Sequence, residues 1–340
     1  MATVGMRQMA RTARTRRRGT ATAALVAGAV TAFLMAGCTT DDRPSDDGRG
    51  RTHSRSQEPD HRDSPAPGSA GPVLAVKIDN VRAARPQTGL DAADLVYAEQ
   101  VEGGLSRLMA VYATRLPQAV GPVRSARESD LELLRQFDEP TLAFSGAQGK
   151  LLPLIDRAPL NAESPESAAS GAYYRGTDKA APHNLYLRPQ RLIGAAPGAD
   201  ALTTGFRYGV APEGGTPEKS RTVRFPSARF TFTWSADRNG WLVSMDGTPT
   251  VTTDGVRVAA ATVVVQYVKV RESRFHDVLG NNSPYTQSVG SGRAQVLRDG
   301  RAFDAEWRRG SATEGTDFTT ADGTPVNFAK GQVWVVFAQA

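Results

Sequence analysis

The chain has 340 residues, of which 40% are hydrophobic and 22% are charged, with 41 Lys and Arg against 35 Asp and Glu. This balance is typical of a globular protein with one or two domains, and it excludes a collagen, a coiled coil, a polytopic membrane protein and a fully disordered chain. The formal charge of +6 arises before residue 38, where six arginines and no acidic residue occur. Because the rest of the chain is neutral, we expect no nucleic-acid partner.

The first 37 residues have the layout of a secretory signal. Arginines within 7–18 precede an uncharged, alanine-rich run over 20–36, and small residues then lead directly to Cys38. This junction resembles a bacterial lipobox, so we expect residues 1–37 to be removed and Cys38 to carry acyl chains such as palmitate. The lipid anchor would hold the protein at the cell membrane, on its extracytoplasmic face. An uncleaved anchor, a plain secreted protein and twin-arginine export are the alternatives.

Cys38 is the only cysteine of the chain. A single cysteine excludes an intramolecular disulfide framework and a multi-cysteine metal site. Residues 38–72 are then predicted to form a disordered tether, because alanine is the only aliphatic residue from 39 to 72. Flexible-chain scaling gives this tether a reach of about 30 Å. His53 and His61 lie in it and are interpreted as solvated histidines.

A first folded region is predicted over 73–200. Between two of its apolar runs, leucines and a phenylalanine at helical spacing predict a helix over 125–138, with Ser125 and Glu128 as its capping box. Strands interleaved with a helix predict an α/β (α+β) N-terminal domain. The apolar, β-rich runs cover 73–78, 94–101, 108–113 and 141–145.

A mainly antiparallel β C-terminal domain is predicted over 221–340, after a loop-rich linker at 201–220. Asn-Gly and Asp-Gly dipeptides punctuate its apolar runs, and such pairs are strong hairpin signals. Gly290-Ser291-Gly292 is interpreted as a turn. The predicted strands cover 222–225, 229–234, 241–245, 261–270 and 332–337.

Polar residues gather where the apolar runs of the first region end, which is where α/β folds hold their ligands. Arg124 and Arg127 flank a predicted helix N-terminus, which favours an anion. The alternative is a capped helix whose arginines pair with Glu99 or Glu102. We expect one ligand-binding cleft, formed by Asp79, Asn80, Arg85, Glu102, Arg107, Arg124, Ser125, Arg127, Arg175, His183 and Asn184.

Glu102 and His183 are the candidate catalytic residues. Glu102 precedes Gly103-Gly104, which allow a sharp backbone turn, but a general acid or base would also need a raised pKa. His183 lies in a loop, where it would contact a ligand, transfer a proton or serve as a hydrogen-bonded structural residue. His276-Asp277 is interpreted as a strand end or a turn, with a second polar cluster that includes Glu272 as the alternative. Since motifs for metalloproteases, serine hydrolases, phosphate-binding loops and dinucleotides are all missing, we expect no metal and no cofactor.

Several short motifs occur in order along the chain. The densest are Lys77-Ile78-Asp79-Asn80, Arg85-Pro86-Gln87, Val101-Glu102-Gly103-Gly104, Gly121-Pro122-Val123-Arg124-Ser125-Ala126-Arg127, Tyr174-Arg175 and Pro182-His183-Asn184. A softer set continues through 262–266, Gly290-x-Gly292 and 331–334. Together these motifs resemble the YerB-like bacterial lipoproteins. The resemblance implies a bacterial envelope lipoprotein with an N-terminal and a C-terminal domain of unknown function, and it implies no particular reaction.

Three functions are consistent with the sequence, and whether the protein is an enzyme stays open. The leading hypothesis is a lipid-anchored protein that binds an anionic cell-wall component, such as a glycan, or an envelope protein through its Arg/Glu/His cleft. The second is an envelope hydrolase or transferase with Glu102 or His183 as general acid or base. The third is a non-catalytic scaffold that positions partners through its β-rich domain.

Overall fold

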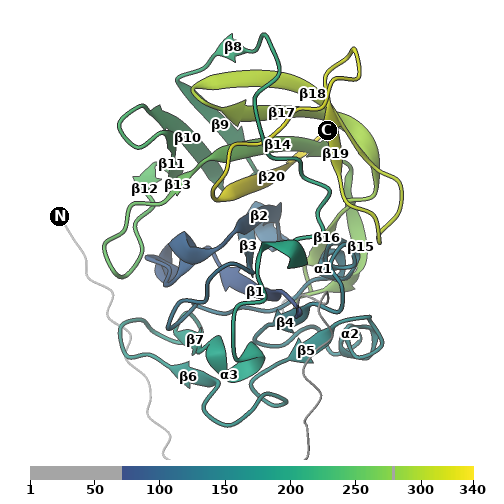
Figure 1. Cartoon of the computed structure of the whole chain (residues 1–340). Coiled ribbons are helices and arrows are strands. Elements are labelled where there is room, and N and C mark those ends of the chain that lie inside the picture. Colours follow the sequence, from purple (N-terminus) through teal and green to yellow (C-terminus); the bar gives the residue numbers. More distant parts are fainter. Residues whose placement is uncertain (1–70, 278–279) are drawn as a thin grey trace, which may run out of the picture. The chain divides into compact units, whose positions relative to one another are not determined.

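The computed structural model describes residues 71–277 and 280–340 (Figure 1). The predicted signal, Cys38 and nearly all of the predicted tether lie outside this part. Among the described residues, no helix is both long enough and apolar enough to cross a membrane.

One eleven-stranded sheet contains strands from both predicted regions, in the order β19-β18-β17-β14-β20-β2-β3-β1-β4-β5, with β8 paired to β18. The first region supplies β1 (Leu74–Asp79), β2 (Leu95–Gln100), β3 (Ser106–Tyr112), β4 (Thr141–Ala143) and β5 (Asn161–Glu163). The second supplies β14 (Thr262–Val268), β17 (Gly290–Arg298), β18 (Arg301–Arg309), β19 (Asp317–Thr319) and β20 (Val333–Gln339), and the predicted linker supplies β8 (Thr216–Pro217). The final strand, β20, lies between β14 and β2 and runs parallel to both.

Smaller elements surround this sheet. A second sheet contains β9 (Ser220–Arg224), β10 (Arg229–Ser235), β11 (Gly240–Met245), β12 (Thr248–Pro249) and β13 (Ala259–Ala260). Two separate hairpins are β6 (Tyr173–Arg175) with β7 (Leu185–Leu187), and β15 (Val270–His276) with β16 (Asn282–Thr286). The helices are α1 (Glu128–Leu134), α2 (Leu152–Ile155) and α3 (Gln190–Ile193), with 3₁₀ turns η1 (Arg82–Ala84), η2 (Leu90–Ala92), η3 (Glu102–Gly104) and η4 (Ala199–Ala201). The predicted fold class, an α/β region followed by a mainly antiparallel β region, is confirmed.

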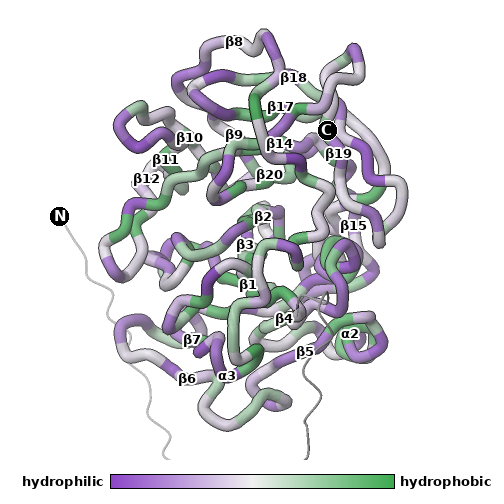
Figure 2. Tube along the Cα trace, viewed as in Figure 1, coloured by the Kyte–Doolittle hydropathy of each residue, from purple (hydrophilic) through white to green (hydrophobic). Residues whose placement is uncertain are grey.

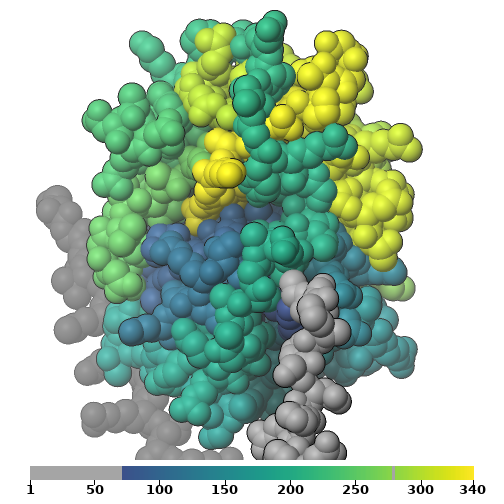
Figure 3. Space-filling model, viewed as in Figure 1, coloured from purple at the N-terminus to yellow at the C-terminus, as the bar shows by residue number. Residues whose placement is uncertain are grey.

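The core lies on both faces of the large sheet, because successive side chains of a strand point to opposite faces. Trp334 of β20 packs between Phe230 and Phe232 of the second sheet, with ring centroids 6.2 and 6.0 Å apart. Val333 and Val335 point to the other face, which Leu133 and Leu134 of α1 help to cover. Figure 2 shows green, hydrophobic stretches along these central strands, and Figure 3 shows the two regions in direct contact. A strand buried on both faces explains the uninterrupted apolar run at 333–338.

Two local predictions are wrong. The helix begins at Glu128, three residues after the predicted cap, because the Arg127 N–H donates to the Asp130 carboxylate at 2.7 Å. It ends at Leu134, four residues before the predicted end at 138. Gly290-Ser291-Gly292 is not a turn but the first part of β17. A Cβ on Gly292 would lie 2.8 Å from Nε1 of Trp307 on the neighbouring strand, so this glycine allows a close approach.

Candidate functional site

Most of the predicted ligand-binding residues line a single cleft of about 670 Å³. The cleft is bounded by the end of β1, the start of β3, the segment before α1 and the β15–β16 hairpin. The predicted residues in its lining are Asp79, Glu102, Arg107, Arg124, Ser125, Arg127 and His183.

The register of the large sheet explains why these charges meet. Asp79, at the end of β1, lies directly opposite Arg107, at the start of β3. Glu99, near the end of β2, lies opposite the same Arg107 from the other side. Directly opposed residues project from the same face of a sheet. The polar ends of three neighbouring strands therefore project together beside α1.

Lys77 is the centre of a buried charge cluster between β1, β2 and α1. Its ammonium lies 2.7 Å from Oδ1 of Asp130, contacts Glu99 and is fully buried. Burial lowers the pKa of Lys77 to about 8, while the charge and hydrogen bond of Asp130 act in the opposite direction. Ser129 donates to the second oxygen of Glu99 at 3.0 Å. These contacts join the first turn of α1 to the sheet. The sequence analysis did not predict this cluster, although a lysine inside an apolar strand run is the signal that could have indicated it.

Glu102 is held by an arginine. Arg127 donates through Nε and Nη2 to its two carboxylate oxygens at 2.6 and 2.7 Å, and Ser283 donates to Oε1 as well. Burial acts to raise the pKa of Glu102, but the hydrogen bonds and charge of Arg127 outweigh it, so the pKa lies below its usual value. This is the arginine–glutamate pairing considered in the sequence analysis. It favours a permanently ionised carboxylate over a general acid, which requires a raised pKa.

Asp79 holds His183 and Arg124 at the cleft surface. Its Oδ2 lies 2.8 Å from Nδ1 of His183 and 3.1 Å from Nε of Arg124. The Asp79 side chain is 2% exposed, whereas those of His183 and Arg124 are 23% and 27% exposed. The buried carboxylate therefore orients two groups that remain accessible to a ligand.

Arg107 differs from the other two arginines. Its Nη1 donates to the Ser125 carbonyl at 3.0 Å, and it forms no ion pair with any residue of 71–277 or 280–340. Burial lowers its pKa to about 9, and the charge of Arg127 adds to this effect, while Glu102 opposes it. The cleft thus contains a guanidinium that lacks its own carboxylate partner.

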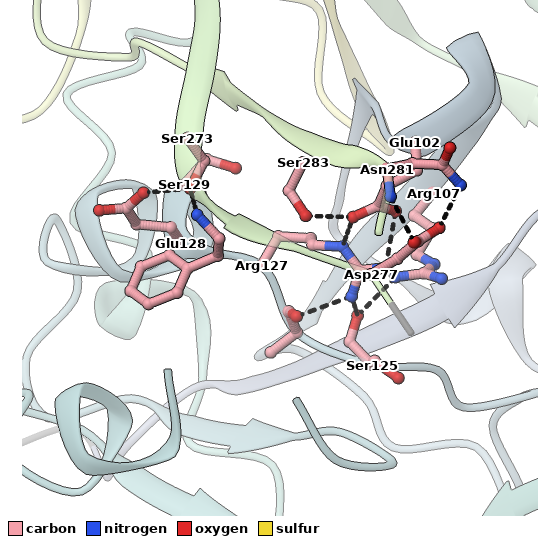
Figure 4. Close-up of polar contacts among 12 residues, drawn as sticks. Glu102, Arg107, Ser125, Arg127, Glu128, Ser129, Ser273, Asp277, Asn281 and Ser283 are labelled. Atoms are coloured by element: carbon pink, nitrogen blue, oxygen red, sulfur yellow. Dashed lines mark hydrogen bonds and ion pairs between the residues drawn. The ribbon is translucent and has the colours of Figure 1, made fainter. Parts of the chain in front are cut away.

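The β15–β16 hairpin of the second region forms another wall of the cleft. Asp277, Asn281 and Ser283 gather around Glu102 and Arg107 in Figure 4. Asp277 accepts hydrogen bonds from the backbone N–H and side-chain amide of Asn281, both at 2.9 Å. His276 ends β15, as the strand-end interpretation predicted. Nothing in the sequence indicated that this hairpin would lie next to the polar residues of the first region.

Two predicted residues, Asn80 and Arg85, lie outside the lining of this cleft. Arg85 donates to the Asn80 side chain at 3.1 Å and pairs with Asp246 of the second region at 2.9 Å. They therefore connect the end of β1 to the second sheet.

Arg175 and Asn184 also lie outside the lining of this cleft. Arg175 donates to the Asn184 side-chain oxygen at 2.9 Å, and Asn184 donates to the Gly176 carbonyl at 2.9 Å. These bonds brace the β6–β7 hairpin, whose connection carries His183.

The lining of the cleft combines three guanidinium groups with four carboxylates, those of Asp79, Glu102, Glu128 and Asp277. In the described part of the chain, no group of three or more His, Cys, Asp or Glu side chains is placed to hold a metal ion. The cationic lining consists of three guanidinium groups, whose planar donor pattern matches carboxylate and phosphate oxygens. Because α1 has only seven residues and Asp130 caps it, side chains and not a helix end would hold the anion.

Comparisons with known proteins agree with this description. Residues 61–202 match the "Protein of unknown function (DUF3048) N-terminal domain", and residues 221–335 match the corresponding C-terminal domain. The chain is 23% identical over 278 residues to "Putative lipoprotein YerB" of Bacillus subtilis (strain 168), covering 77% of this chain and 80% of that protein. The crystal structure of the YerB protein from Bacillus subtilis has a TM-score of 0.66 at 19% identity, covering 79% of this chain and 91% of that one. The resemblance inferred from the motifs is confirmed.

Proposed function

This chain belongs to the DUF3048 family, and we propose that it is a lipid-anchored, extracytoplasmic protein of the bacterial envelope that binds an anionic cell-wall component in the cleft. Its similarity to a protein named as a lipoprotein supports the envelope assignment. The predicted lipidation of Cys38 supplies the anchor.

The observation that carries the ligand assignment is the charge pattern of the cleft. Arg124 and Arg127 are matched by Asp79 and Glu102, whereas Arg107 has a backbone carbonyl as its partner. The other two acidic residues of the lining are Glu128, which accepts a hydrogen bond from Ser273, and Asp277, which accepts one from Asn281. An anion placed between Arg107 and Arg124 would receive charge-assisted hydrogen bonds from both guanidinium groups.

A phosphate-bearing wall polymer fits these properties. The cleft volume of about 670 Å³ falls within the range of ligand sites, and it accommodates a short length of polymer. Leu105, Leu151 and Phe275 line the same cleft and offer apolar contacts to the carbon atoms of such a chain. We therefore choose oligomeric glycerol phosphate as the probe.

Titration calorimetry of the purified full-length protein with this oligomer tests the ligand assignment. We expect Arg107→Met and Arg124→Met each to weaken binding by about 10- to 100-fold, the cost of losing a hydrogen bond to a charged group. Arg207→Met, which removes an exposed arginine outside the cleft, is the matched control. Unchanged affinity in the Arg107→Met, Arg124→Met double variant would defeat the assignment.

The anchor has a separate test. Cys38→Ala removes the only thiol that an acyl chain could modify. We expect the variant to move from the membrane fraction to the soluble envelope fraction, because the acyl chains supply the membrane affinity. Mature variant protein that stays membrane-bound would show that Cys38 is not the anchor.

A further inference from the structure

Both histidines of the described part of the chain line the same cleft as the arginines. His183 comes from the connection between β6 and β7, and His276 is the last residue of β15. They therefore belong to different regions of the chain, and only the fold brings them to one cavity.

The two imidazoles have different environments. His183 is held through Nδ1 by the buried Asp79 carboxylate at 2.8 Å, and its side chain is partly accessible. A carboxylate on one ring nitrogen fixes the orientation and tautomer of an imidazole, and leaves Nε2 to take up a proton. His276 is exposed at the end of its strand. One histidine is thus oriented as a base, and the other is open to solvent.

We propose that the cleft hydrolyses phosphodiesters, with His183 as the general base and His276 as the general acid. The inference rests on the proposed function, because Arg107 and Arg124 must hold the phosphate. Guanidinium groups at the non-bridging oxygens would also stabilise the charge that these oxygens carry in the transition state.

The proposed step balances as a hydrolysis. A water molecule gives a proton to Nε2 of His183 while its oxygen forms a bond to phosphorus. The bond from phosphorus to the leaving oxygen breaks, and that oxygen takes a proton from the imidazolium form of His276. The products are a phosphomonoester and an alcohol, with one water consumed. Proton exchange with solvent then returns both histidines to their starting forms.

The acidic residues of the cleft argue against glycoside hydrolysis. That reaction uses two carboxyl groups, of which one is a protonated general acid. Here Glu102 is bonded by Arg127 and keeps a lowered pKa, and Asp79 is shared by Arg124 and His183. Glu128 and Asp277 also line the cleft, and they accept hydrogen bonds from Ser273 and Asn281. The proton transfers are therefore assigned to the two imidazoles.

The test uses the purified full-length protein with bis(4-nitrophenyl) phosphate, by following release of 4-nitrophenolate. We expect turnover by the wild type, and a fall in kcat of about 100-fold or more in His183→Gln and in His276→Gln. The KM should change by less than about threefold, since the arginines still hold the phosphate. Asp79→Asn should also lower kcat, because the amide no longer orients the imidazole. Arg207→Met is the control and should keep the wild-type rate.

The outcomes separate this inference from the proposed function. Binding of oligomeric glycerol phosphate without hydrolysis of either that oligomer or bis(4-nitrophenyl) phosphate would overturn the catalytic inference and leave the binding function intact. Turnover that is equal in the wild type and both histidine variants would likewise overturn it. If the oligomer does not bind and bis(4-nitrophenyl) phosphate is not hydrolysed, both proposals are wrong.

Discussion

The two regions of the molecule contribute differently to the cleft. The first region supplies all three arginines and the Asp79–His183 pair, from strand ends and loops. The second contributes the β15–β16 hairpin, whose hydroxyl groups bind acidic side chains of the first region. Ser273 donates to Glu128 at 2.5 Å and Tyr285 donates to Glu132 at 2.6 Å. The arginines of the site thus come from the first region. The second region contributes His276, Asp277 and the contacts that orient acidic side chains of the first region.

The largest expected effect comes from a substitution in β20, the strand that pairs with strands of both regions. Trp334→Ala removes a fully buried indole from β20, and we expect it to lower the free energy of unfolding by about 3–5 kcal/mol. Urea unfolding should show one transition that shifts as a whole, since β20 pairs with strands of both regions. Val210→Ala, at an 85% exposed position, should stay close to the wild type. A variant in which the first region unfolds unshifted would contradict the shared sheet.

Lys77→Met tests the buried charge cluster that Lys77 forms with Glu99 and Asp130 in the first region. The substitution leaves the carboxylates of Glu99 and Asp130 buried without their ammonium partner, at a cost of about 3 kcal/mol. Lys150→Met removes an exposed lysine from the same region and should have little effect. Unfolding midpoints in urea provide the measurement. Equal midpoints for the two variants would mean that this charge cluster does not stabilise the fold.

Glu132→Ala tests how much the contacts of the β15–β16 hairpin contribute to stability, apart from the contribution of the large sheet. Glu132 accepts hydrogen bonds from Tyr285, from Ser288 and from the Val289 N–H at 2.6–3.1 Å. Their loss should cost about 2 kcal/mol, and amide exchange should accelerate over 281–289 more than in β10. Glu213→Ala, an exposed matched control, should leave both regions unchanged. Uniform acceleration across the protein would show that the hairpin is not a separate unit.

The smallest expected effect is a pH dependence. The pKa of Glu102 is lowered in the folded protein, so its ionised form stabilises the fold above the ordinary glutamate range. That contribution is lost as the pH falls through the folded pKa. Between about pH 5 and pH 3, wild-type stability should therefore fall more steeply than that of Glu102→Gln. Parallel stability curves would indicate that the Arg127 and Ser283 contacts do not favour the charged form.

Local patterns in the sequence predicted much of the first region. Apolar runs bounded by polar residues located β1, β2 and β3, because a buried strand needs only short-range periodicity to be recognised. The same pattern placed Asp79 and Arg107 near strand ends, where the sheet register then brings them together. The predicted start of α1 was wrong. The helix starts where the Asp130 carboxylate accepts a hydrogen bond from the Arg127 N–H.

The parts that could not be predicted depend on contacts between distant segments. Ser283 reaches Glu102, and Tyr285 reaches Glu132, across the join between the two regions. No local period encodes such pairs, so the hairpin's place in the cleft was missed. Arg85 shows the converse case. Its motif suggested a ligand, while the fold directs its guanidinium to Asn80 and Asp246.

The central claim, that the cleft binds an anion between Arg107 and Arg124, can be tested by crystallising the full-length protein with oligomeric glycerol phosphate. We predict a phosphate group with oxygens about 3 Å from the guanidinium nitrogens of both arginines, next to His183. A phosphate bound at another surface, with Arg107 still bonded only to the Ser125 carbonyl, would contradict the account.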